Sequence, residues 1–82
     1  MITVSFETKK DQEAVLDKAV KYFGDNVGLK IAERSSCCAF FGDYPRSYVR
    51  VTLSQKDQKF EVVVESKEFE YWAKRFAEEF KG

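Results

Sequence analysis

The side chains with the most distinctive chemistry are two adjacent cysteines, Cys37 and Cys38, in a chain that contains no histidine. Adjacent thiols can close a small disulfide ring, bind a soft metal or metalloid as thiolates, or act as a redox sensor. A nucleophilic cysteine of the Cys-His type is excluded because no histidine is present to act as its base. Zinc and redox sites typically use Cys-x-x-Cys spacing, so the adjacent pair does not match the usual pattern for either.

Both cysteines are expected on a strand, where neighbouring side chains point to opposite faces of the sheet. This alternation predicts Cys37 in the core beside Ala39 and Phe41, and Cys38 on the open surface beside Phe40. In a reducing cytosol we expect both to be free thiols. A redox or soft-metal site at the pair is kept as an alternative function.

Other enzymatic chemistry finds little support in the residue pattern. Glu61 and Glu65 lie on one side of a predicted strand, but residues four apart on a strand are separated by about 13 Å, too far to share a proton. Gly24 and Gly28 belong to no phosphate-binding loop, because no helix and no Lys-Ser or Lys-Thr pair follows them. We therefore expect a protein that is not an enzyme and has no cofactor and no metal ligands.

The composition is that of a small globular protein, and we expect a single domain over residues 1–82. Fourteen basic and fourteen acidic residues give zero formal net charge, which argues against a general polyanion binder. The N-terminus lacks the pattern of a secretory signal, and no apolar run approaches the roughly 20 residues that a membrane span needs. These features predict a cytoplasmic protein with no membrane partner.

The periodicity of apolar residues predicts strands and helices in alternation. Thr8 is expected to cap the first helix, Gly24 to end it, and Ser66 to cap the last helix. The expected elements are a strand over residues 2–7, a helix over 8–23, strands over 29–41, 48–53 and 59–65, and a helix that begins after Ser66 and carries Phe69 to Phe80.

The segment over residues 29–41 is the least regular, because its inward positions are apolar at both ends and polar in the middle. Thirteen residues is also long for one strand. We expect a bulge, a break or an overhanging edge near residues 33–36, with two short strands as the alternative. A bulge would turn the later side chains to the other face.

Together the elements predict an α+β fold, a two-layer sandwich with the order β-α-β-β-β-α. Its four-stranded, mainly antiparallel sheet carries two helices on one face. The first strand is expected to run parallel to the second, either alongside it or with one strand between them. The predicted core consists of Ile2, Val4, Phe6, Leu16, Ala19, Val20, Phe23, Ile31, Val49, Val51, Phe60, Val62, Val64, Phe69, Trp72 and Phe76.

The helix-free face of this sheet is the predicted place of function, as a surface that binds a partner protein or a second copy of the chain. Tyrosine and arginine are common interface anchors, although packing across strands explains the same residues. Weak binding of single-stranded nucleic acid is a further alternative, opposed by Glu7, Glu61 and Glu65 on the same face and by the absence of an RNA-stacking motif. The candidate binding residues are Arg34, Cys38, Phe40, Tyr48, Arg50 and Val63.

Overall fold

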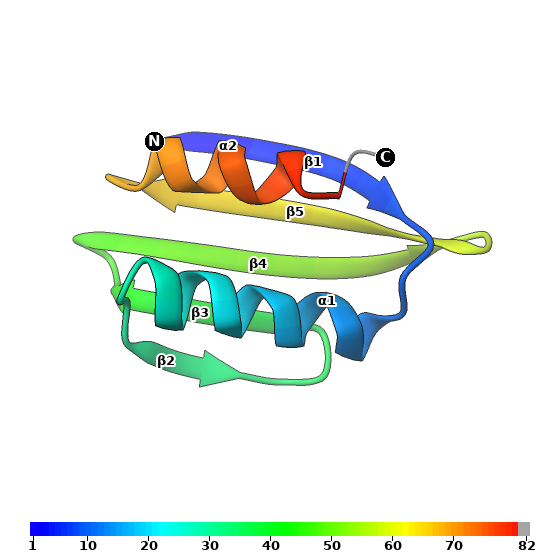
Figure 1. The fold of residues 1–82 in the computed structure, drawn as a ribbon, viewed down its shortest axis with the longest axis horizontal. Coiled ribbons are helices and arrows are strands. Elements are labelled where there is room, and N and C mark those ends of the chain that lie inside the picture. Colours follow the sequence, from blue (N-terminus) through cyan, green and yellow to red (C-terminus); the bar gives the residue numbers. More distant parts are fainter. Residues whose placement is uncertain (81–82) are drawn as a thin grey trace.

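The computed structural model describes residues 1–80 and shows one layer of helices on one layer of sheet (Figure 1). The α+β class and the placement of both helices on one face are as predicted. In chain order the elements are β1 (Ile2–Thr8), α1 (Gln12–Ala19), the π-helical segment η1 (Val20–Asn26), β2 (Ile31–Arg34), β3 (Cys38–Asp43), β4 (Ser47–Lys56), β5 (Lys59–Lys67) and α2 (Glu70–Glu78).

The sheet has five strands, not the four that were predicted, and every neighbouring pair is antiparallel. The segment expected as one long strand is a hairpin of β2 and β3, which is the alternative of two short strands. Its chain reverses over polar residues 35–37, and the Ser35 amide donates to the Cys38 carbonyl at 2.8 Å. One continuous strand over this segment would place polar side chains on the buried face of the sheet, and burying polar groups without hydrogen-bond partners is unfavourable. The polar residues in the middle of the segment therefore favour a reversal.

The predicted position of the first strand is wrong. The strand order is β1-β5-β4-β3-β2, so β1 and β2 occupy opposite edges and three strands separate them. Hairpin connections carry the chain from β2 back across the sheet, and β5 then pairs with β1 in continuous register from Ile2 opposite Ser66 to Thr8 opposite Phe60. Val62 and Val64 of β5 thereby lie opposite Phe6 and Val4 of β1 on the helix-covered face.

Both helices begin or end differently from the sequence expectation. Thr8 ends β1, and Asp11 caps α1 by accepting a hydrogen bond from the Ala14 amide at 2.8 Å. Helical structure continues past Gly24 because η1 extends to Asn26. Ser66 lies in β5, and its hydroxyl accepts the Phe69 amide at 3.2 Å, just before α2 begins.

The core lies between the sheet and the two helices. Helix α1 packs on β3 and β4, and α2 packs on β1 and β5 (Figure 1). Phe23 and Phe76 form its centre, with ring centroids 5.1 Å apart. The prediction of burial is wrong for two residues, because Ile31 is 45% exposed on edge strand β2 and Trp72 is 37% exposed on the flank of α2. Ala39 and Phe41 are buried, as strand alternation predicted, and Val15, Tyr22, Leu53, Ala73 and Ala77 are buried although the predicted core list did not contain them.

Within residues 1–80, neither helix has the length and apolar character needed to cross a membrane.

Candidate functional site

The helix-free face of the sheet is ordered into rows by the strand register. One row runs from Glu33 through Phe40 and Arg50 to Glu65, because each is the direct partner of the next. Residues in such a row are about 5 Å apart, close enough for side chains to touch. The row on one side contains Cys38 and Val63, and the row on the other contains Tyr48 opposite Gly42. The sheet therefore brings together five of the six predicted binding residues.

Three rings and one guanidinium form a continuous cluster on this face, which we call the aromatic patch: Phe40, Tyr44, Tyr48 and Arg50. The ring of Tyr44 meets that of Tyr48 edge to face at a centroid distance of 4.7 Å, and its centroid is 6.3 Å from that of Phe40. The Arg50 guanidinium lies 5.5 Å from the centre of the Phe40 ring, within cation-π range. Tyr44 covers Tyr48, which is only 3% exposed, while Tyr44 itself is 60% exposed.

A shallow hollow of about 380 Å³ opens beside the patch and is lined by Ala32, Glu33, Phe40, Tyr44 and Arg50. Its walls are mostly ring and methyl carbon, with Glu33 on one side of Phe40 and Arg50 on the other. Arg50 has no ion-pair partner among the described residues. The hollow thus combines an apolar floor with a cation that is available to a ligand.

The base of the patch is fixed by a hydrogen bond across two strands. The Tyr48 hydroxyl donates to Oε2 of Glu65 at 2.6 Å. This bond to a carboxylate, with burial as a smaller cause, raises the pKa of Tyr48 to about 12. Tyr48 therefore keeps the proton of this bond beyond the pH at which an ordinary tyrosine ionises, and it supports Tyr44 from below.

The loop that carries Tyr44 depends on Gly42. Gly42 has φ +93°, a backbone conformation that residues with a side chain rarely adopt. A Cβ on Gly42 would lie 2.7 Å from the Ser47 carbonyl oxygen. Its partner across the strands is Tyr48. The close approach of β3 and β4 at this point places Tyr44 over Tyr48.

Arg34 was predicted on the open face, and the structure contradicts this. The register of β2 shifts between Ile31 and Glu33, and Arg34 pairs with buried Ala39, so its side chain lies on the helix side. There it bonds to Asp17 at 2.8 Å and to Glu13 at 3.2 Å, both on α1. The bulge turns the side chain to the other face, and Arg34 anchors the edge hairpin to α1.

The cysteines also differ from expectation. Cys37 is exposed in the turn before β3, not buried, and it is joined to Cys38 by a disulfide. Alternation along β3 does hold from Cys38 onward, because Ala39 and Phe41 are buried while Cys38 and Phe40 face the open side. Cys37 lies in a turn and not in a strand, so its side chain need not point to the face opposite that of Cys38. The two sulfur atoms can therefore bond to each other.

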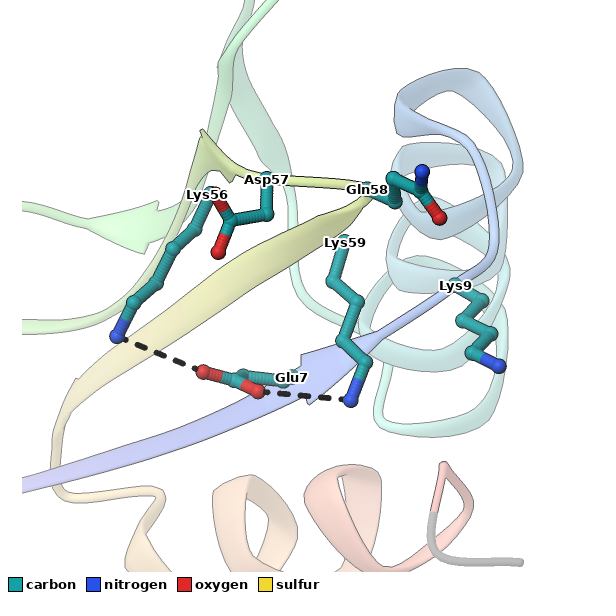
Figure 2. A pocket seen from close by; sticks show the side chains of 6 residues that line it. All are labelled: Glu7, Lys9, Lys56, Asp57, Gln58 and Lys59. Atoms are coloured by element: carbon teal, nitrogen blue, oxygen red, sulfur yellow. Dashed lines mark ion pairs between the residues drawn. The ribbon is translucent and has the colours of Figure 1, made fainter.

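A second hollow, of about 530 Å³, lies at the other end of the sheet around the β4–β5 turn (Figure 2). Glu7 points between Lys56 and Lys59 and lies 3.7 Å and 3.9 Å from their amino groups, whereas Lys9 points away. Two of its three lysines are thus already paired. These contacts are exposed and of little energetic weight, so this hollow provides weak support for a ligand site.

Sequence reasoning missed the residues that complete the patch. Tyr44 lies between the strands expected over residues 29–41 and 48–53, and Ala32 and Glu33 lie in the segment that was expected to be irregular. The Gly42-Asp43-Tyr44-Pro45 segment carried the available signal, because glycine, aspartate and proline favour a tight turn, and a tight turn keeps Tyr44 close to the strands on either side.

Comparison of the chain with protein-family models gave no match, and comparison with curated proteins gave none either.

Proposed function

We propose that this chain is a non-enzymatic binding module that holds a short segment of a partner protein on the aromatic patch. The observation that carries the proposal is the state of Tyr44, a large ring that is 60% exposed yet held against Tyr48 and Phe40. A pre-positioned aromatic loses little conformational freedom on binding, which favours affinity. Tyrosine and arginine are also the residues that most often dominate binding energy at interfaces.

The geometry defines the chemistry of the partner segment. An apolar side chain fits the hollow over Phe40. A carboxylate of the partner complements Arg50, which the described residues leave without an ion pair. Glu33, on the other side of Phe40, favours a basic or amide group there. The expected ligand is therefore a peptide with an apolar residue between an acidic and a basic one.

Panning of a random-peptide phage library against the immobilised protein tests this directly. Enriched peptides should share the apolar and acidic pair and bind the native chain at least ten-fold more tightly than the Tyr44→Ser variant. Tyr71→Ser is the matched control, because Tyr71 on α2 is 61% exposed but lies on the other layer. Peptides that bind Tyr44→Ser and the native chain equally, or no enrichment at all, would refute the proposal.

Nucleic acid fits this face poorly. Glu61 lies opposite Glu7, and Glu65 lies opposite Arg50 and accepts the Tyr48 hydroxyl, so carboxylates follow the strands on the side where phosphates would lie. Phosphate binding depends on accumulated positive charge. A filter-binding titration at low salt should accordingly show no retention of a single-stranded oligonucleotide.

The disulfide supports a second proposal, that Cys37 and Cys38 form a reversible thiol pair. Cys37 is exposed, so a dithiol reductant can reach the bond. The reductant gives two electrons and two protons, the S–S bond breaks to two thiols, and the reductant becomes a disulfide. The reduced pair would also suit a soft metal or metalloid.

Alkylation with iodoacetamide, followed by intact-mass spectrometry, tests the thiol pair. Protein purified in air should gain no adduct before treatment with dithiothreitol and two adducts after it. Two adducts without reductant, or none after reductant, would contradict a reversible pair.

A further inference from the structure

The two edges of the sheet differ in how well they are protected against pairing with another strand. Edge strand β2 has only four residues, a register shift, and charged Glu33 and Arg34. Short length, irregularity and charge are the usual means by which proteins block edge pairing. Edge strand β1 has none of them, because its seven residues pair one to one with β5 and only Glu7 is charged. Its outer edge is therefore a regular template for another strand.

A groove of about 260 Å³ runs beside this free edge. It is lined by Val4, Ser5 and Phe6 of β1 and by Lys74, Ala77 and Glu78 of α2 (Figure 1 shows α2 and β1 side by side). Val4 and Phe6 are half-buried, so apolar surface reaches the edge itself. Lys74 and Glu78 flank the groove, and neither takes part in an ion pair within residues 1–80.

We propose that a second copy of this chain occupies the groove, with β1 pairing antiparallel to β1 of the other copy so that the two sheets become one. A two-fold axis perpendicular to the sheet maps each face onto the same face, so inward residues must lie opposite inward residues. Pairing about Val4 meets this condition. It places Ile2 opposite Phe6 and Thr3 opposite Ser5 of the other copy, with no like charges facing each other.

The helices support the same arrangement. Helix α2 packs on both β1 and β5, so its axis lies about half a strand spacing inside β1. Two such helices across a shared β1 pair are then separated by about two spacings, or roughly 10 Å, which is a normal helix-packing distance. Ala77 in the groove is small enough to allow this approach.

Charge complementarity selects a second copy over another partner. The two-fold axis makes the two α2 helices antiparallel, so Lys74 of each copy lies near Glu78 of the other. Because Lys74 and Glu78 are one helical turn apart on the same helix, both contacts form together. The dimer also places both aromatic patches on the same side of the joined sheet, roughly 30 Å apart by strand spacing, which would allow bivalent binding.

Light scattering coupled to size-exclusion chromatography, over a concentration series, tests the dimer. The native chain should show the mass of two 9.5 kDa chains. Lys74→Glu should weaken dimerisation at least ten-fold, and the double variant Lys74→Glu/Glu78→Lys should restore it. Lys21→Glu, an exposed lysine on η1, makes the same charge change without effect.

Three outcomes would overturn the proposal: a native chain that stays monomeric at the highest concentration, a Lys74→Glu variant as dimeric as the native chain, or no rescue by the double variant. Dimerisation lost in Tyr44→Ser but kept in Lys74→Glu would place the interface on the aromatic patch and would also contradict it. Peptide binding to the patch is measured separately and does not depend on the dimer.

Discussion

Replacement of Gly42 by alanine tests whether the close approach of β3 and β4 sets the position of the aromatic patch. Gly42 and Gly28 have nearly equal φ values, +93° and +86°. A Cβ on Gly42 would lie 2.7 Å from the Ser47 oxygen and 3.2 Å from Cα of Tyr48, whereas a Cβ on Gly28 meets nothing within 4 Å. Alanine at either position therefore carries the cost of a positive φ, but only alanine at position 42 also clashes with neighbouring backbone atoms.

The magnitudes follow from these two contributions. A positive φ costs a residue with a Cβ about 1–2 kcal/mol, and a clash in a packed region adds about 1–3 kcal/mol. Gly28→Ala should thus lower the free energy of unfolding by about 1–2 kcal/mol, and Gly42→Ala by about 2–5 kcal/mol. A chain of 82 residues has a total stability of only about 4–12 kcal/mol, so the second loss is large.

Urea unfolding followed by circular dichroism measures both losses, and the difference between them isolates the clash. In thermal unfolding, each kcal/mol should lower the melting temperature by about 4–8 °C. Gly42→Ala should also weaken peptide binding at temperatures where it is still folded, since Tyr44 is displaced. Equal losses for the two variants would refute the argument that Gly42 is needed for close approach.

Four further predictions concern single residues. Glu65→Ala should return the pKa of Tyr48 from about 12 toward the ordinary 10, seen as earlier tyrosinate absorbance on alkaline titration, and an unchanged titration would contradict the role of that bond. In the native chain the pKa of Tyr48 is higher in the folded than in the unfolded state. The Tyr48–Glu65 bond should therefore stabilise the fold fully below about pH 10 and lose this effect as the pH rises through about 12, which urea unfolding at alkaline pH can follow. Arg34→Ala should lower the free energy of unfolding by about 0.5–1 kcal/mol, measured with urea, because Arg34 joins the hairpin to α1 on the helix side. Peptide binding should stay unchanged, and weaker binding would argue against that placement. Asp57→Gly should stabilise the chain by about 1 kcal/mol, because Asp57 adopts φ +59° in the β4–β5 turn, and a loss of stability would show that the carboxylate has another role there.

Regular alternation was enough to predict most of the fold from sequence. In β4 and β5, an apolar residue recurs at every second position, and the buried faces contain Val49, Val51, Val62 and Val64 as expected. The two helices were predicted on one face for the same reason, since each strand offers a single apolar side to cover.

The errors arise where local pattern does not determine the structure. The polar residues near Ser35 indicate an interruption, but whether the chain bends or reverses depends on the pairing energy of β2 with β3, which sequence spacing does not give. The position of β1 depends on a contact between residues about 60 apart in the chain. Ile31 lies on edge strand β2 and Trp72 on the flank of α2, so both are at the border of the core and periodicity overestimates their burial.

The candidate site could be predicted in part for the same physical reason. Phe40, Tyr48 and Arg50 follow strand alternation and were expected on one face. Tyr44 joins them only because Gly42 folds the loop back, a conformation that depends on three-dimensional contacts. Arg34 does not join them, because a single register shift in β2 turns its side chain to the helix side of the sheet.

The most direct test of the proposed binding surface is to map a selected peptide onto the ¹⁵N-labelled protein by two-dimensional NMR. We predict that the amide signals that shift on titration belong to β2, β3, β4 and the loop between β3 and β4, centred on Phe40, Tyr44 and Arg50. Signals of α1 and α2 should stay in place. Shifts centred on the helix layer, or no saturable shifts on the aromatic patch, would contradict the account.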